Sequence, residues 1–515
     1  MGTSRSGTVS WFAPESHPGR GRTMPTATQD KAVTPASRRL PRSWPCLLLG
    51  LALCALAGCA TRTWNTRIKP AGVEDRYEFK TRFPHAPRDT FVVLAFSGGG
   101  TRAAAFSYGV LEKLRDTEVP SGGQPTRLLD LVDVVTSVSG GSYTAAYYGL
   151  FGDRIFGDFR TRFLYRDWQG ELLGLLGRPD HLLSIAGRHY NRSDLVAAYL
   201  DRTLLEGKTF ADMSPAGLPM VILNASDLNN ATTFSFIQQQ FDFLCSDLST
   251  YPVANAVMAS AAVPGLFAPI ALRNYPDCPQ RHQPWVAQSL AHDDLLSRRH
   301  AVALALSRYD DPERMPVLRL VDGGITDNLG VRGSMMSPVA QYGNVPDMAG
   351  AFTPEQLRRV RHVLVIVANA QVYAPYPWSE RGRAPGTIDI LRASFDASLG
   401  ILNNETAALA KNGFLMWARH VNALRPAGDP TVDVNFAVLT FGQIKDGAER
   451  QRFNAMPTAF HLRRDQVDAL RALAGRLLTQ APEFQSFLRE LRDEQSALVD
   501  PHATTAAEPA GVGRR

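Results

Sequence analysis

Apolar runs of strand length alternate with helical patterns through the middle of this chain. The first run, residues 91–96, ends at three glycines, and apolar side chains at helical spacing follow over residues 102–115. A second run, residues 131–136, is followed by a small-residue turn and a helical stretch over residues 142–150. This order is typical of an α/β fold with a mainly parallel sheet, whose strands are buried on both faces. Further runs of the same kind lie at residues 220–225, 318–321 and 362–367.

Less regular segments surround this pattern and set the predicted domain limits. Residues 150–215 and 280–310 lack a regular apolar period, and we interpret them as a lid or cover. Residues 464–480 carry apolar side chains at helical spacing and predict an amphipathic closing helix. The predicted segments are a polar tether at 59–88, a folded domain at 89–480 with an insertion at about 280–311, and an extension at 481–515 whose end, from about 499, is disordered.

The first 58 residues have the organisation of a secretory signal. Three arginines, at 38, 39 and 42, precede an apolar run over residues 46–57 that ends in small residues. The run is shorter than the roughly 20 residues that a membrane span needs. Its end, Leu56-Ala57-Gly58-Cys59, resembles the lipobox of bacterial lipoproteins, which implies a diacylated Cys59 as the new N-terminus. The alternative is an ordinary cleaved signal, and Met24 is an alternative start.

Charge and composition change this interpretation little. Apolar residues make up 44% of the 515-residue chain and charged residues 20%, which indicates a globular protein. Of the net charge of +6, residues 1–58 contribute seven basic and two acidic side chains, so +1 remains for the rest. The basic balance therefore belongs to the signal, and we exclude a nucleic-acid partner.

Two clusters could serve structure rather than chemistry. Cys245 and Cys278 lie outside the signal and either form a disulfide in an oxidising compartment or remain buried free thiols. The insertion carries His282, His292, Asp293, Asp294 and His300, but these residues lack the spacing that brings two ligands to one helical face. We interpret the insertion as solvated and expect no metal.

A serine in a small-residue turn is the strongest candidate for catalysis. Ser139 follows a predicted strand and precedes a helix, a setting that exposes a nucleophile, although Ser-Gly-Gly is also common in plain turns. A serine hydroxyl needs a base. His420 and His461 lie downstream but outside turn motifs, whereas Asp322 follows a strand directly and precedes two glycines. We therefore predict Asp322 as the base, with an Asx-type turn as the alternative.

The glycines at 98–100 could supply an oxyanion hole, because absent side chains let an ester carbonyl approach the backbone N–H groups. The spacing Gly98-x-Gly100-x-x-Ala103 also satisfies a dinucleotide-binding fingerprint. The next predicted strand, however, leads into Ser139 rather than into the acidic residue that would bind a ribose.

Taken together, these motifs resemble the patatin-like phospholipase family over residues 91–335. Ser97–Arg102 resembles its glycine-rich oxyanion motif, Ser139 its nucleophile and Asp322-Gly323-Gly324 its dyad motif. Two further blocks, Ala259–Pro269 and Asp327–Gly330, also resemble the family. The resemblance departs at Ser137, where the usual turn has Gly, and at Ala103. We expect some strain in the turn.

The resemblance implies a three-layer α/β/α fold and a serine lipid acyl hydrolase that needs no cofactor. Ser139 and Asp322 would form the catalytic dyad, and Gly98, Gly99, Gly100, Thr101 and Arg102 the oxyanion loop, with Arg102 as its support. The expected substrates are membrane phospholipids or other lipid esters. Ala60 after Cys59 resembles the outer-membrane sorting pattern, so we expect an anchored protein of the bacterial cell envelope. The alternative is a non-catalytic lipoprotein of this fold that binds lipid or acts as a scaffold.

Overall fold

In the computed structural model, the strands predicted from the sequence lie together in one mixed sheet. The structure describes residues 62–69, 76–78, 89–181, 190–213, 219–332, 359–373, 376–380, 382 and 384–499. The predicted signal and Cys59 lie outside these ranges, as do residues 500–515 of the predicted disordered end. All described residues belong to one compact unit, Ala52–Arg515.

The central sheet has the strand order β12-β11-β2-β5-β6-β10-β9, and β7 pairs with β6. The strands from β12 to β6 are parallel, and this part of the sheet confirms the predicted mainly parallel arrangement. Residues 318–321, predicted as a further strand of this sheet, lie in β10, which is antiparallel to β6. The bounds are β2 Thr90–Phe96, β5 Val132–Val138, β6 Met220–Asp227, β7 Thr232–Ser235, β9 Ile270–Arg273, β10 Val317–Asp322, β11 His362–Ala368 and β12 Asp433–Leu439.

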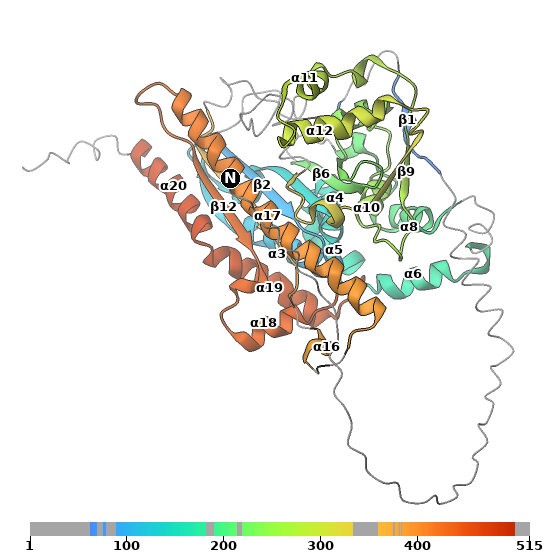
Figure 1. Cartoon of the computed structure of the whole chain (residues 1–515). Helices are drawn as coiled ribbons and strands as arrows, with labels where there is room; N and C mark the ends of the chain where they lie inside the picture. Colours follow the sequence, from blue (N-terminus) through green and yellow to red (C-terminus); the bar gives the residue numbers. More distant parts are fainter. Residues whose placement is uncertain are drawn as a thin grey trace, which may run out of the picture. The chain divides into compact units, whose positions relative to one another are not determined.

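Helices cover both faces of this sheet, which gives the expected three layers (Figure 1). Asn435 on β12 donates a hydrogen bond to Glu490 of α20 (Pro482–Val499), whereas the ring of Phe436 contacts that of Phe414 on α17 (Thr387–Leu424). Because successive side chains of a strand point to opposite faces, α20 and α17 lie on opposite sides of β12. Every residue of β2 and β11 is buried.

Three further helices complete the layers around the strands. The helix α3 (Gly100–Arg115) begins in the glycine loop, two residues earlier than predicted, and packs against α19 (Arg464–Gln480) and α4 (Gly140–Phe151). The remaining elements are α5 Arg154–Phe159, α6 Trp168–Leu176, α8 Arg192–Leu200, α9 Gln238–Asp242, α10 Val253–Ser260, α11 Pro284–His292, α12 Arg298–Ser307, α13 Gly324–Asp327, α16 Pro377–Glu380, α18 Gly447–Asn454, β1 Thr66–Arg67, β3 Glu118–Ser121, β4 Gln124–Arg127 and β8 Ser246–Asp247.

Two segments predicted to lie outside the folded domain pack into it. Within the predicted tether, β1 pairs with β8, and the buried Tyr77 exchanges hydrogen bonds with the backbone of Val221 on β6. Beyond residue 480, α20 buries Phe484 and Phe487 in the main hydrophobic core. The core therefore extends past both of the predicted limits.

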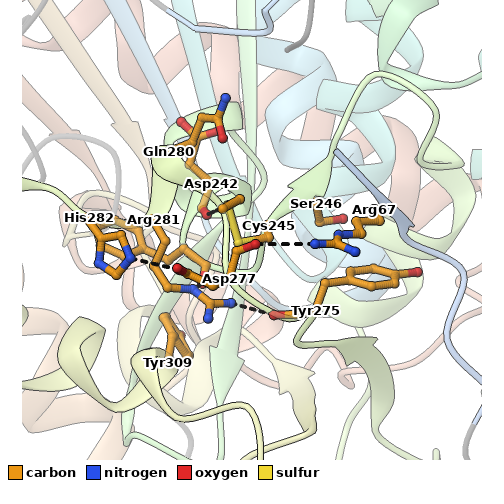
Figure 2. Close-up of a disulfide and its surroundings, with 12 residues drawn as sticks. Arg67, Asp242, Cys245, Ser246, Tyr275, Asp277, Gln280, Arg281, His282 and Tyr309 are labelled. Carbon is orange, nitrogen blue, oxygen red and sulfur yellow. Dashed lines mark hydrogen bonds and ion pairs between the residues drawn. A yellow bond between two sulfur atoms is a disulfide. The ribbon is translucent and has the colours of Figure 1, made fainter. Parts of the chain in front are cut away.

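A disulfide between Cys245 and Cys278 lies where β1 joins the body. Figure 2 shows this bond beside Arg67 of β1, which donates a hydrogen bond to the backbone carbonyl of Asp277. The buried Arg281 donates to the carbonyls of Phe243 and Tyr275, and this ties the start of the predicted insertion to the body. The insertion itself folds into α11 and α12, which pack against each other.

Candidate active site

Ser139 lies in a sharp turn between β5 and α4. Its backbone has φ 50° and ψ −119°, a left-handed conformation that is strained for a residue with a side chain. The following glycines allow this turn because a Cβ at position 140 would lie 2.1 Å from the carbonyl oxygen of Gly100. The small residues seen in the sequence are thus required by backbone contact, and they present the Ser139 hydroxyl at the N-terminus of α4.

Asp322 is hydrogen-bonded to Ser139. The Ser139 Oγ donates to Asp322 Oδ2 over 2.7 Å, and the Gly324 N–H donates to Asp322 Oδ1 over 2.8 Å. Both dyad candidates are nearly buried, with 6% and 7% of their surfaces exposed. Burial raises the pKa of Asp322 to about 6, against the opposing effects of the hydrogen bonds from Ser139 and Gly324. The carboxylate is therefore a base whose pKa lies close to neutral pH.

Neither histidine considered from the sequence takes this place. His461 lies 3.7 Å from Asp167, and His420 is exposed on α17. Among the side chains that the structure describes, the hydrogen-bond partner of the Ser139 hydroxyl is Asp322.

Ser260, at the end of α10, connects the two loops that carry Ser139 and Asp322. Its Oγ accepts the Ser139 N–H at 2.8 Å and donates to the Asn224 carbonyl at 2.6 Å. Its own carbonyl accepts the Gly323 N–H at 3.0 Å. In the sequence, Ser260 lies in the block Ala259–Pro269 that resembles the family, but nothing there indicates a role for it. Its partners Ser139, Asn224 and Gly323 lie far from it in the sequence, so these contacts leave no local pattern.

The glycine loop lies directly beside Ser139, but it offers fewer donors than predicted. The Gly98 N–H donates to the Asn328 carbonyl over 3.0 Å, and the Thr101 N–H donates to the Ala459 carbonyl over 2.9 Å. These two groups are therefore already occupied, which corrects their predicted role as oxyanion donors. No hydrogen bond between described residues uses the N–H of Gly99 or Gly100, at the start of α3.

Close packing against neighbouring atoms of the protein explains why this loop is made of glycines. A Cβ on Gly98 would lie 2.3 Å from Asn328 Oδ1, and one on Gly100 would lie 2.5 Å from the Ala459 carbonyl oxygen. Gly99 and Gly100 also have positive φ values, 137° and 60°. Contacts within the protein, and the positive φ values, thus account for the glycines that the dinucleotide fingerprint would also explain.

Arg102 is a support of the loop and is not placed as a donor to substrate. Its buried guanidinium donates to the carbonyls of Ala370 and Met456, each over 2.8 Å, and to Thr458 Oγ1 over 3.0 Å. Burial lowers its pKa to about 10. These contacts hold the start of α3 against the loops that follow β11 and α18, and part of the predicted oxyanion set is therefore structural.

The polar residues of the insertion are used in separate pairs. His282 contacts Asp277, Asp293 pairs with Arg299, and His300 contacts the Ser289 carbonyl. Over the described ranges, no group of three or more histidine, cysteine or acidic residues has the arrangement of a metal site. None of the helices in these ranges is both long and apolar enough to cross a bilayer.

Comparisons with known proteins agree with the sequence resemblance. Residues 94–334 match the family model described as patatin-like phospholipase, and the match supports lipid hydrolase activity. A search of curated proteins returned no match.

The solved structures to which the chain is similar include human GIVD cytosolic phospholipase A2, with 13% identity, a TM-score of 0.36 and coverage of 87% of this chain and 67% of that one. Its complex with methyl gamma-linolenyl fluorophosphonate and terbium chloride has 14% identity and a TM-score of 0.35, and the match covers 89% of this chain and 65% of that one. The complex with the fluorophosphonate alone has 13% identity and a TM-score of 0.35, with coverage of 87% and 64%. The chain thus spans about two thirds of these structures, and a likeness of this extent carries no information about substrate.

Proposed function

We propose, from the patatin-like phospholipase domain that residues 94–334 form, that this protein hydrolyses lipid esters with Ser139 as nucleophile and Asp322 as base. The observation that carries the proposal is the 2.7 Å hydrogen bond from Ser139 Oγ to Asp322 Oδ2. It joins a hydroxyl on a strained turn to a buried carboxylate whose second oxygen is held by Gly324.

In the first half of the reaction, Ser139 Oγ attacks the ester carbonyl carbon while Asp322 takes the hydroxyl proton. The negative charge that develops on the carbonyl oxygen is stabilised by the N–H groups of Gly99 and Gly100, which lie at the N-terminus of α3. The tetrahedral intermediate then collapses, the ester C–O bond breaks, and Asp322 returns the proton to the leaving alcohol. The product of this half is an acyl group on Ser139.

In the second half, water replaces the alcohol. Asp322 takes a proton from water as its oxygen attacks the acyl carbon, and the same N–H groups hold the second oxyanion. Collapse releases a fatty acid, and the proton returns from Asp322 to Ser139 Oγ. One carboxylate thus serves as base and acid in turn, for which a pKa near neutrality is suited.

We further propose that lipid on Cys59 anchors the protein at the membrane that contains its substrate, in the bacterial cell envelope. The lipobox-like Leu56–Cys59 behind a basic and an apolar segment supports this location. Intact mass spectrometry of protein from its native membrane should show a diacylated Cys59, whereas an unmodified N-terminus would refute the anchor.

The test compares Ser139→Ala with a matched buried serine variant, Ser107→Ala. Ser107 lies buried on α3, and its hydroxyl has no hydrogen-bond partner among the described residues. Hydrolysis of a phospholipid panel, read by mass spectrometry, and labelling by a fluorophosphonate probe should disappear in Ser139→Ala and persist in Ser107→Ala. Turnover that survives in folded Ser139→Ala would overturn the assignment.

A further inference from the structure

The chain that follows Cys59 joins the body almost at once. Arg62 follows Cys59 by three positions, which a fully extended chain spans in at most about 11 Å. Thr63 forms a β-bridge with Ala271 of β9, and β1 pairs with β8. The lipid of the proposed anchor is therefore tied to this edge of the body, without the flexible spacer that a tether over residues 59–88 would provide.

Side-chain contacts fix the start of this segment to the body. The guanidinium carbon of Arg62 lies 3.8 Å from the ring centroid of Trp64 and 4.6 Å from that of Tyr190. The indole N–H of Trp64 donates to the buried Asp194 on α8 over 3.1 Å. The buried Asn65 exchanges hydrogen bonds with the backbone of the last residue of β9. Because these partners belong to the folded domain, the segment moves with the body.

Three exposed cations lie along the same edge. Arg67 ends β1, Lys69 follows it by two positions, and Arg273 ends β9. Among the described residues, no carboxylate forms an ion pair with any of the three. Arg67 instead donates to the backbone carbonyl of Asp277 over 3.3 Å (Figure 2), and the guanidinium carbon of Arg273 lies 5.3 Å from the ring centroid of Tyr275. We call Arg67, Lys69 and Arg273 the cationic edge.

The acids of the adjoining segments do not balance this charge. Within the described segments 62–69, 246–250 and 270–277, the acids are Asp247 and Asp277. Asp247 is nearly buried and accepts hydrogen bonds from the N–H and the hydroxyl of Ser249, and the exposed carboxylate of Asp277 contacts His282 at 2.8 Å. With Arg62, the same segments carry four cations against these two acids, so the edge is positively charged.

The chemistry of this edge favours an anionic bilayer over a second copy of the chain. Basic side chains beside a membrane anchor are attracted to anionic headgroups, by about fivefold in the binding constant for each Lys or Arg. Two copies would bring like charges together, which is repulsive. The exposed residues of β1, Thr66 and Arg67, also offer no apolar side chain to a protein interface.

We propose that the cationic edge rests on the anionic headgroups of the bilayer that holds the lipid of Cys59. This inference rests on the proposed anchor and not on the proposed hydrolysis. The backbone that supports the dyad lies eight positions before β9, where the Ala262 carbonyl accepts the Asp322 N–H over 2.9 Å. Contact at the cationic edge therefore fixes the orientation of the active site relative to the membrane that contains the substrate.

The test measures how fast an amine-reactive acylating reagent labels Lys69 in lipid-anchored protein, read by mass spectrometry. Ser139→Ala protein is used so that the vesicle lipids stay intact. Lys69 should be labelled about fivefold or more slowly on phosphatidylcholine vesicles with about 30% phosphatidylglycerol than on phosphatidylcholine alone, because anionic headgroups cover it. The matched reporter is the exposed Lys445, which follows β12 at the opposite end of the strand order from β9 and should be labelled equally on both.

A double variant, Arg67→Gln with Arg273→Gln, keeps Lys69 as the reporter. Its labelling on anionic vesicles should return to the rate on phosphatidylcholine, because two cations together account for about 25-fold in binding. The control, Arg419→Gln with Arg489→Gln, removes the same charge from exposed positions on α17 and α20 and should leave Lys69 protected.

Three outcomes would overturn the proposal. They are equal labelling of Lys69 on the two kinds of vesicle, equal loss of protection in the two double variants, and protection that follows the amount of protein per vesicle rather than the lipid charge. The last outcome would indicate a second copy at this edge.

The result is separable from the proposed function. Protein that carries lipid on Cys59 and hydrolyses lipid esters, but leaves Lys69 unprotected, refutes the contact of the cationic edge alone. Protected Lys69 in a protein whose wild type hydrolyses no lipid refutes the hydrolase and leaves the contact in place. An unmodified Cys59 refutes the anchor and this contact together.

Discussion

The sharpest test of the site geometry is the removal of one hydroxyl, in Ser260→Ala. The fully buried Ser260 Oγ accepts the Ser139 N–H, donates to the Asn224 carbonyl and lies 2.9 Å from Ser142 Oγ. Its loss leaves buried polar groups without a partner and should lower the free energy of unfolding by about 1–3 kcal/mol. It also frees the strained backbone of Ser139, whose hydroxyl must stay aligned with Asp322.

We expect kcat for a soluble ester to fall about 10- to 100-fold in Ser260→Ala, with a smaller change in KM, because misplacement of reacting groups acts on the chemical step. The control is Thr144→Val on α4, which removes a buried hydrogen bond of 2.9 Å from Thr144 Oγ1 to the Ala104 carbonyl of α3. Both variants should lose comparable stability in urea unfolding. If kcat falls equally in the two variants, Ser260 stabilises the fold without positioning the nucleophile.

Three further predictions follow from the site and its surroundings. Because burial raises the pKa of Asp322 to about 6 and the reaction needs its carboxylate, kcat should be steady above that pH and fall about tenfold per unit below it; a profile that stays flat to about pH 4.5 would contradict this role. Gly100→Ala places a Cβ 2.5 Å from the Ala459 carbonyl oxygen and should displace the Gly100 N–H and reduce kcat about 100-fold in folded protein, whereas wild-type turnover would show that catalysis does not depend on this close packing of the loop. Replacement of Cys245 and Cys278 by alanine opens a loop with a sequence separation of 33 and should cost about 3–4 kcal/mol in urea unfolding, and an unchanged midpoint would count against a structural bond.

The sequence predicted the elements whose patterns are local. The apolar runs that form β2, β5, β6 and β11 are fully or almost fully buried, and their periodicity is visible without any knowledge of partners. Strand direction is not local. The run at residues 318–321 predicted a strand, with the exposed Arg319 in its middle, but the antiparallel pairing of β10 with β6 depends on the topology of the chain. The burial of Tyr77 in the predicted tether was hidden for a similar reason, since a single aromatic residue forms no period.

Within the site, the motifs indicated which residues meet but not which of their groups are available. Ser139 and Asp322 are separated by 183 positions and yet hydrogen-bonded, as the motif resemblance implied. The availability of each N–H in the glycine loop depends instead on carbonyls supplied by Asn328 and Ala459, far along the chain. A glycine motif therefore predicts close backbone approach without revealing whether a ligand or the protein itself approaches.

The hydroxyl of Ser137, which departs from the glycine usual in this turn, belongs to a chain of hydrogen bonds. A hydroxyl has one proton, and that of Ser260 goes to the Asn224 carbonyl, so Ser142 must donate to Ser260. Ser137 must then donate to Ser142, 3.1 Å away, which makes it the first donor of a chain that runs towards Asn224. Ser137 thus sits at the end of this chain and Ser260 at its junction with the nucleophile. A glycine at position 137 would remove one terminal donor and leave the support of Ser139 in place, so the departure from the family pattern lies where the site depends on it least.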